Sequence, residues 1–222
     1  MEWTLIIAVA IIGFIVQLRL KSVFRKYSKV LSPGGLTGAQ IAQKMLNDNG
    51  IYDVRITCID GELTDHYDPT KKTVNLSRDV YGTNSVSAAA VAAHECGHAV
   101  QHKEGYGPLR LRSKLVPTVN ISSKLSMIVI IIGLFVMEYY PALFWIGIAM
   151  FSTVFLFSVV TLPVEFNASR RALAWLNASN SLSALEVAQA KEALKWAAST
   201  YVVAALSSLA SLLYYIGLGS RN

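Results

Sequence analysis

The chain has 222 residues, of which 53% are hydrophobic and only 15% are charged. This composition is too apolar for an ordinary soluble protein and is typical of a chain that resides in a bilayer. The formal charge of +6 does not indicate a nucleic-acid partner, because the basic residues flank apolar runs instead of forming one block. The two cysteines, Cys58 and Cys96, provide no disulfide framework, and Cys96 is expected to be a small packing residue.

The first apolar run covers residues 3–18, with Thr4 and Gln17 as its polar interruptions. Basic residues follow this run, whereas a cleaved signal peptide carries its positive charge in front of the apolar segment. We therefore predict a retained transmembrane helix at residues 1–20, with its basic flank in the cytoplasm.

The next region, residues 21–118, reads as a small α+β domain. Thr37 is a candidate cap for a short amphipathic helix that ends at Asn49–Gly50. Three strand candidates follow at Val54–Cys58, Leu63–Tyr67 and Thr73–Leu76. The last of these could form a sheet edge that pairs with an extended peptide.

A metal-binding motif lies in the alanine-rich segment 87–100, which lacks proline and therefore favours a helix. His94 and His98 are four residues apart, so they lie on one helical face and can bind one ion. Glu95 lies about 100° round the helix from His94, within reach of a water on that ion. The pattern is that of a zinc hydrolase. The alternative is a pair of surface histidines.

Three further segments complete the predicted topology. Residues 119–163 contain two apolar runs around Glu138–Pro141 and read as a transmembrane hairpin, with Tyr139 and Tyr140 at the far interface. Residues 164–198 form a polar helical segment in which Ser183 and Glu186 make a capping box. Residues 199–219 form a fourth transmembrane helix.

The distribution of charge supports this arrangement. Four spans place residues 19–124 and 163–199 on one side, where they hold 15 and 4 of the 20 lysine and arginine residues. Only Arg221 falls on the other side. The positive-inside rule then predicts a multi-pass membrane protein with His94 on the cytoplasmic face.

A catalytic zinc needs a third protein ligand and an open position for water. Glu165 is the best candidate, because the hairpin returns the chain to the side of His94. Pro163 could begin a new helix and place Glu165 in its first turn. The alternative role for Glu165 is a carboxylate that caps a helix amino end. Other acidic or imidazole candidates fit less well: His102, Glu104, Glu186 and Glu192. The last two are expected on a solvated helix face.

These residues predict a mechanism with one Zn²⁺ per chain. Zinc bound by His94, His98 and Glu165 would lower the pKa of its water to about 7. Glu95 would act as general base and return the proton to the leaving amine. The tetrahedral oxyanion needs a second electrophile, for which the sequence offers several candidates without choosing among them: His66, Tyr81, Tyr106, Arg170 and Arg171.

Four segments carry a resemblance to a known family: Leu63–Pro69, Thr73–Ser77, Val91–Gln101 and Pro163–Ala172. The likeness extends over nearly the whole chain, including the placement of the four spans. They resemble the bacterial YugP-type membrane zinc metallopeptidases, with a more distant similarity to the HtpX and CAAX prenyl protease group of integral-membrane gluzincins. The resemblance implies that His94, His98 and Glu165 bind zinc and that Glu95 is the base. The HtpX group carries an aspartate four residues after the ligand glutamate, where this chain has Ser169. A hydroxyl orients an imidazole more weakly than a carboxylate, so Asn167 or Asp65 are further candidates for that role.

We therefore expect a mainly α integral membrane protein with about four transmembrane helices and a small α+β zincin-like cytoplasmic domain. The predicted function is a zinc-dependent endopeptidase that hydrolyses peptide bonds of membrane or membrane-adjacent proteins. Its partners would be a protein or peptide substrate and the lipid bilayer, and a regulatory membrane partner is left open. The alternative is a non-proteolytic zinc-binding scaffold, for which Glu95 would be unnecessary.

Overall fold

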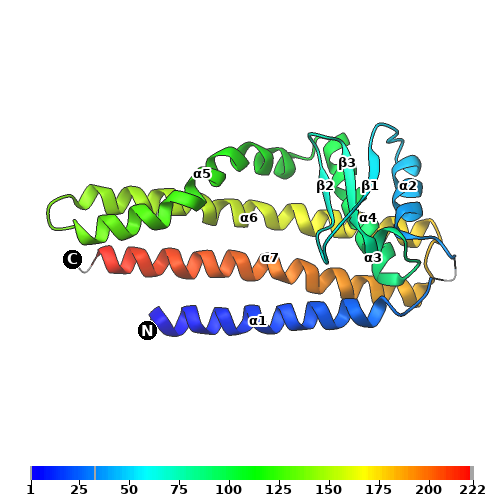
Figure 1. Ribbon diagram of the computed structural model, residues 1–222, viewed down its shortest axis with the longest axis horizontal. Coiled ribbons are helices and arrows are strands. Elements are labelled where there is room, and N and C mark those ends of the chain that lie inside the picture. The colour runs from blue at the N-terminus through cyan, green and yellow to red at the C-terminus, as the bar shows by residue number, and fades with distance from the viewer. Residues whose placement is uncertain (1, 33, 221–222) are drawn as a thin grey trace. The chain divides into compact units, whose positions relative to one another are not determined.

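The computed structural model describes residues 2–32 and 34–220 (Figure 1). Met1 of the predicted first span and Arg221, the single far-side basic residue, lie outside the described residues. Seven helices and three strands follow one another in the described part of the chain: α1 (Glu2–Tyr27), α2 (Gly38–Asp48), β1 (Arg55–Ile59), β2 (His66–Asp68), β3 (Thr73–Ser77), α3 (Arg78–Tyr81), α4 (Val86–Lys103), α5 (Gly107–Phe135), α6 (Pro141–Ala178) and α7 (Ala184–Gly219).

The chain divides into two compact units. The apolar unit comprises Met1–Ile15, Arg110–Pro163 and Thr200–Asn222, and the histidine unit comprises Val16–Leu109 and Val164–Ser199. Helices α1, α5, α6 and α7 contribute residues to both units.

The apolar unit is built from helices whose exposed side chains are themselves largely hydrophobic. Four described helices, α1, α5, α6 and α7, are long and apolar enough to cross a membrane, as the sequence predicted. Helices α5 and α6 approach closely at Gly133. A Cβ atom on this residue would lie 2.5 Å from the backbone nitrogen of Phe144. Phe144 is fully buried in a small core with Ile130 and Leu212. Tyr139 and Tyr140, in the turn between the two helices, are exposed.

Pro163 does not begin a new helix, and that expectation was wrong. It lies inside α6, which is continuous from Pro141 to Ala178. Proline removes one backbone hydrogen bond from a helix. The burial of Val164, Ala168 and Ala172 on the following turns stabilises the helix beyond that point.

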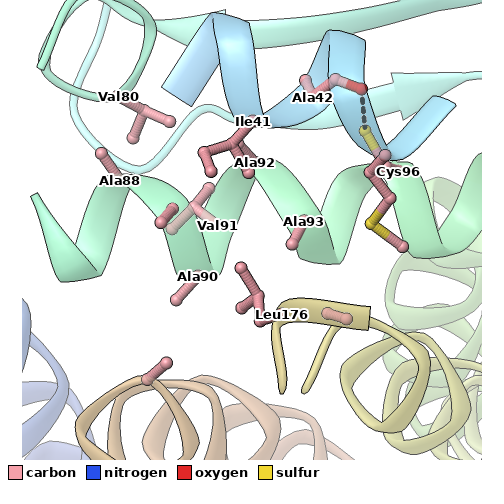
Figure 2. Close-up of a cluster of buried hydrophobic side chains, with 14 of the residues drawn as sticks. Ile41, Ala42, Val80, Ala88, Ala90, Val91, Ala92, Ala93, Cys96 and Leu176 are labelled. Carbon is pink, nitrogen blue, oxygen red and sulfur yellow. Dashed lines mark hydrogen bonds between the residues drawn. The ribbon is translucent and has the colours of Figure 1, made fainter. Parts of the chain in front are cut away.

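The histidine unit is organised around α4, most of whose residues are buried. Figure 2 shows Ile41 and Ala42 of α2 on one side of α4 and Leu176 of α6 on the other. Alanines along α4 allow its neighbours to approach from several directions, since a methyl group takes little space. Cys96 is buried in this core with its thiol against the Ala42 carbonyl oxygen, so its expected packing role is confirmed.

Both predicted helix caps are present in the histidine unit. Thr37 forms a capping box with Gln40 at the start of α2. Ser183 and Glu186 exchange hydrogen bonds at the start of α7. Glu186 is buried, so its expected place on a solvated helix face was wrong. It serves instead as the reciprocal acceptor of the cap.

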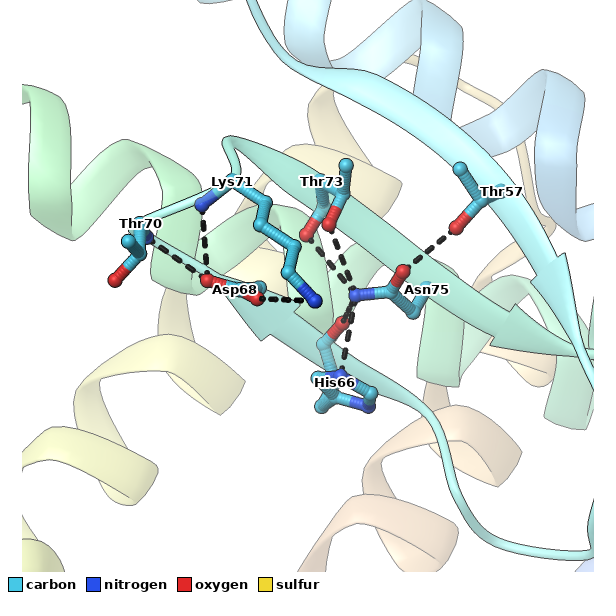
Figure 3. Close-up of polar contacts among 7 residues, drawn as sticks. All are labelled: Thr57, His66, Asp68, Thr70, Lys71, Thr73 and Asn75. Atoms are coloured by element: carbon cyan, nitrogen blue, oxygen red, sulfur yellow. Dashed lines mark hydrogen bonds and ion pairs between the residues drawn. The ribbon is translucent and has the colours of Figure 1, made fainter.

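The three strands form one sheet in the order β1–β3–β2. β1 pairs in parallel with β3, and β2 pairs antiparallel with β3. The segment Thr73–Leu76 therefore lies in the central strand, and the expectation that it forms a substrate-pairing edge was wrong. Polar contacts cross the sheet from Thr57 through Asn75 to His66 (Figure 3). Alternation of apolar and polar residues predicts a strand but does not predict which strands pair with it.

Candidate metal centre

Three donor side chains converge within the histidine unit. His94 and His98 lie one turn apart on α4, with their ring centroids 4.8 Å apart. Glu165 Oε2 of α6 lies 3.3 Å from His94 Nε2 and 3.5 Å from His98 Nε2. One ligand atom from each residue lies within 4.8 Å of the other two. Two imidazoles and a carboxylate are a donor set that zinc uses in catalytic sites, so these residues could hold such an ion.

The cluster is largely buried, so the carboxylate of Glu165 needs partners for its charge. Glu165 is only 2% exposed, and His98 is also buried. An isolated carboxylate is costly to bury, so it requires positive charge or donated hydrogen bonds. Its neighbours include the two imidazole nitrogens, which can either share protons with it or bind a cation together with it.

The pKa of His98 also indicates that the cluster favours positive charge. Burial, the largest influence, lowers the pKa of His98, but the hydrogen bond and charge of Glu165 raise it, and the charge of Glu95 adds to them. The net result is a pKa of His98 above its ordinary value. The environment therefore favours positive charge at this point.

Each histidine has a second contact through its Nδ1 atom. His94 Nδ1 lies 3.2 Å from Ser169 Oγ, so a hydroxyl contacts the imidazole at the position where the HtpX group has aspartate. His98 Nδ1 lies 3.0 Å from Gln101 Oε1. Sequence reasoning missed Gln101. The available signal was its position three residues after His98, on the same face of α4.

Two further residues were expected as possible partners of the ligands. Asn167 is linked to the site, since its Oδ1 accepts a hydrogen bond from Gln101 Nε2. Asp65 has other partners, because its carboxylate accepts hydrogen bonds from the backbone N–H and hydroxyl of Ser77. Glu95, next to His94 in the chain, is buried and close enough for its charge to act on His98.

The alternative third ligands have other described contacts. His102 Nδ1 lies 2.8 Å from Tyr67 Oη, and Glu104 accepts a hydrogen bond from Arg171. Glu192 accepts one from Tyr27. Among the described residues, the only group able to hold a metal ion is His94, His98 and Glu165.

Two of the residues considered for stabilising the oxyanion, His66 and Arg171, have described contacts with other groups. His66 contacts Asn75 and the Thr64 carbonyl oxygen, and Arg171 contacts Asn167 and Glu104. These described contacts give neither residue a place beside the three donors. Tyr81, Tyr106 and Arg170 likewise stay candidates only.

The fold and donor set define a class: a chain with four membrane-length helices and a two-histidine, one-glutamate cluster of the kind found in zinc hydrolases. A family model described as "Putative neutral zinc metallopeptidase" matches residues 2–220. The "Putative membrane protease YugP" of Bacillus subtilis (strain 168) is 44% identical over 212 residues, which cover 96% of this chain and 93% of the relative. The chain therefore belongs to this zinc metallopeptidase family. No solved structure matches it.

Proposed function

We propose that the protein is an integral-membrane zinc-dependent endopeptidase whose site residues are His94, Glu95, His98 and Glu165. The convergence of the three donor atoms within 4.8 Å of one another carries this proposal. Glu95 distinguishes a hydrolase from a binding scaffold, because zinc binding through His94, His98 and Glu165 needs no further carboxylate between the two histidines.

The roles of the residues follow from their chemistry. His94 and His98 through Nε2, and Glu165 through its carboxylate, would hold one Zn²⁺ per chain. When bound, the ion would supply a Lewis acid that polarises a peptide carbonyl and lowers the pKa of a water to about 7. Glu95 accepts the proton of the attacking water and later delivers it to the leaving amine nitrogen.

The position of Glu165 in the chain suggests the substrate class. It comes directly after a long apolar segment of α6, so the chain returns from a predicted span immediately before it contributes a ligand. Residues 21–118 and 164–198 would supply the catalytic part, and residues 1–20, 119–163 and 199–219 would supply the spans. We infer that substrates are membrane or membrane-adjacent proteins.

The proposed orientation places the catalytic residues on the cytoplasmic face of a bacterial cytoplasmic membrane. The excess of lysine and arginine in residues 19–124 and 163–199 supports this orientation. The membrane name of the 44% identical relative agrees with the location in a bilayer.

Hydrolysis by the purified full chain tests the proposal. The protein in detergent or lipid should cleave an unstructured protein such as casein, lose this activity on treatment with a zinc chelator, and regain it when Zn²⁺ is restored. Zinc binding without hydrolysis of casein or of any peptide in a diverse library would favour the scaffold alternative.

A further inference from the structure

Gln101 is a fully buried polar side chain next to the metal centre. It is 0% exposed and lies on α4 one turn after His98. Its amide oxygen lies 3.0 Å from His98 Nδ1, and its amide nitrogen contacts two atoms of α6. A buried amide with partners on both of its atoms is oriented by them.

The donor and acceptor roles in this cluster are determined from its outer end. Arg171 Nε can only donate, so the Asn167 atom 2.7 Å away must be its oxygen. Gln101 Nε2 lies 2.9 Å from that oxygen and 2.8 Å from the Val164 carbonyl oxygen. Facing two acceptors, this end of the Gln101 amide must be the donor.

The orientation of Gln101 then selects a tautomer of His98. Because the amide nitrogen faces α6, the amide oxygen faces His98 Nδ1 and must accept its hydrogen. A neutral imidazole with hydrogen on Nδ1 carries its lone pair on Nε2. This Nε2 is the atom that lies 3.5 Å from Glu165 Oε2.

His94 has no equivalent constraint. Its Nδ1 contacts the hydroxyl of Ser169, and a hydroxyl can either donate or accept. The two imidazoles therefore differ in their hydrogen bonds. His98 Nδ1 faces an oxygen that can only accept, whereas His94 Nδ1 faces a hydroxyl that can donate or accept.

We propose that Gln101 is a positioning residue for the metal site. By accepting the hydrogen of His98 Nδ1, its amide oxygen leaves the lone pair of His98 on Nε2, where it can bind the metal. Asn167 and Arg171 support it by holding the amide in one orientation, and Glu104 holds Arg171 in turn through a 2.6 Å ion pair. The inference rests on the proposed function in that it takes His98 to be a zinc ligand.

Zinc affinity is the direct measure of this role. Loss of a group that orients a ligand histidine typically costs 10–100-fold in metal affinity. Gln101→Leu removes the acceptor and the two donated hydrogen bonds together. Gln101→Glu keeps an oxygen for His98 Nδ1 but loses the donor toward Val164 and Asn167. Val100→Ala is the matched control, because it truncates a core residue of the same helix.

The experiment measures zinc dissociation constants by chelator competition on the full-length purified chain, and thermal unfolding of each metal-free variant. We expect Gln101→Leu to weaken zinc binding about 10–100-fold and to change the visible spectrum of the Co²⁺-substituted protein. Gln101→Glu and Val100→Ala should lower the unfolding temperature but keep zinc affinity within about threefold of wild type, since each leaves an acceptor for His98 Nδ1.

Two results would overturn the inference: wild-type affinity in Gln101→Leu, or equal weakening by Gln101→Leu and Gln101→Glu. If Gln101→Leu does not fold, ¹⁵N-histidine NMR of the zinc-loaded wild type decides instead. We expect hydrogen on His98 Nδ1, and metal on that nitrogen would refute the role of Gln101. A wild type that does not bind zinc would instead refute the proposed function itself.

Discussion

A Cβ atom built on Gly97 of α4 would lie 2.7 Å from the carbonyl oxygen of Ala168 on α6. No ordinary contact is this short, so the two helices can cross here only because Gly97 lacks a side chain. The crossing is next to the donor residues, since Gly97 directly precedes His98 on α4 and Ala168 follows Glu165 by three residues on α6. The glycine of the histidine motif thus sets the distance between its two imidazoles and their carboxylate partner.

Replacing Gly97 by alanine should separate the two helices at the site. We expect Gly97→Ala to lower the free energy of unfolding by about 1–3 kcal/mol, the usual cost of overpacking. Zinc affinity should fall at least about tenfold, as when a ligand loses its orientation. Gly107→Ala is the control, because a Cβ there meets nothing within 4 Å. Zinc titration that finds Gly97→Ala and Gly107→Ala equal to wild type would show that the close crossing does not shape the site.

Glu165 is expected to be indispensable for zinc binding. Glu165→Gln keeps the shape of the side chain but removes the negative charge, so zinc affinity should fall beyond the 10–100-fold that an outer partner costs. Zinc at 100 times its dissociation constant should stabilise wild type by about 2.7 kcal/mol and leave Glu165→Gln unchanged in thermal unfolding. Glu62→Gln, which removes the charge of an exposed carboxylate in the histidine unit, is the control. Equal stabilisation of Glu165→Gln and wild type would remove Glu165 from the ligand set.

The two cysteines offer a native test of topology. Cys58 is exposed and Cys96 is buried, and burial raises the pKa of the Cys96 thiol well above its ordinary value. An impermeant maleimide should therefore modify Cys58 alone in the folded protein, and only from the cytoplasmic side. Tyr139→Cys in a Cys58→Ser background should react from the opposite side. Reaction of both positions from one side would contradict the hairpin topology.

Asp65 should make stability depend on pH in the acid range. Burial, the largest influence, raises the pKa of the Asp65 carboxyl, although hydrogen bonds from Ser77 oppose it. The folded state therefore binds the proton more tightly than the unfolded state, and this residue's contribution to stability falls as pH rises through the two pKa values. Asp65→Asn should gain stability relative to wild type as pH rises from about 4 to 7. A constant difference in unfolding temperature across that range would contradict the assignment.

Removing the same side chain altogether should have the opposite effect. Asp65→Ala leaves the Ser77 backbone N–H without its acceptor, so we expect a loss of about 1–3 kcal/mol near neutral pH. Unfolding at pH 7 measures it directly, with Asp65→Asn as the matched variant. Equal stability of the alanine and asparagine variants would show that the Ser77 contact contributes little.

Much of the candidate site could be predicted from local patterns. The spacing of His94 and His98 specifies a shared helical face, and the apolar runs specify membrane-length helices. Thr37 and Ser183 mark helix starts because their hydroxyls accept backbone hydrogen bonds within three residues. Each of these inferences depends on interactions between residues close together in the chain.

The features that the sequence did not reveal depend on contacts between distant segments. The central position of β3 arises from its parallel pairing with β1. Parallel strands are not joined by a tight turn, so the sequence between them carries no local signal for this pairing. The role of Gln101 needs Val164 and Asn167, more than 60 residues away. Pro163 was predicted to start a helix because proline disfavours the interior of a helix. The burial of the helical turns that follow it, which stabilises a continuous α6, is not evident from the sequence.

The most direct test of the central claim compares wild type with Glu95→Gln, both loaded with zinc, for hydrolysis of a peptide bond. Glutamine keeps the size of the side chain but cannot accept the proton, so we expect zinc affinity to stay near that of wild type while the turnover rate falls by about 10²–10⁴-fold. Equal turnover by the two zinc-loaded proteins would contradict the assignment of Glu95 as general base and of the protein as a zinc endopeptidase of this kind.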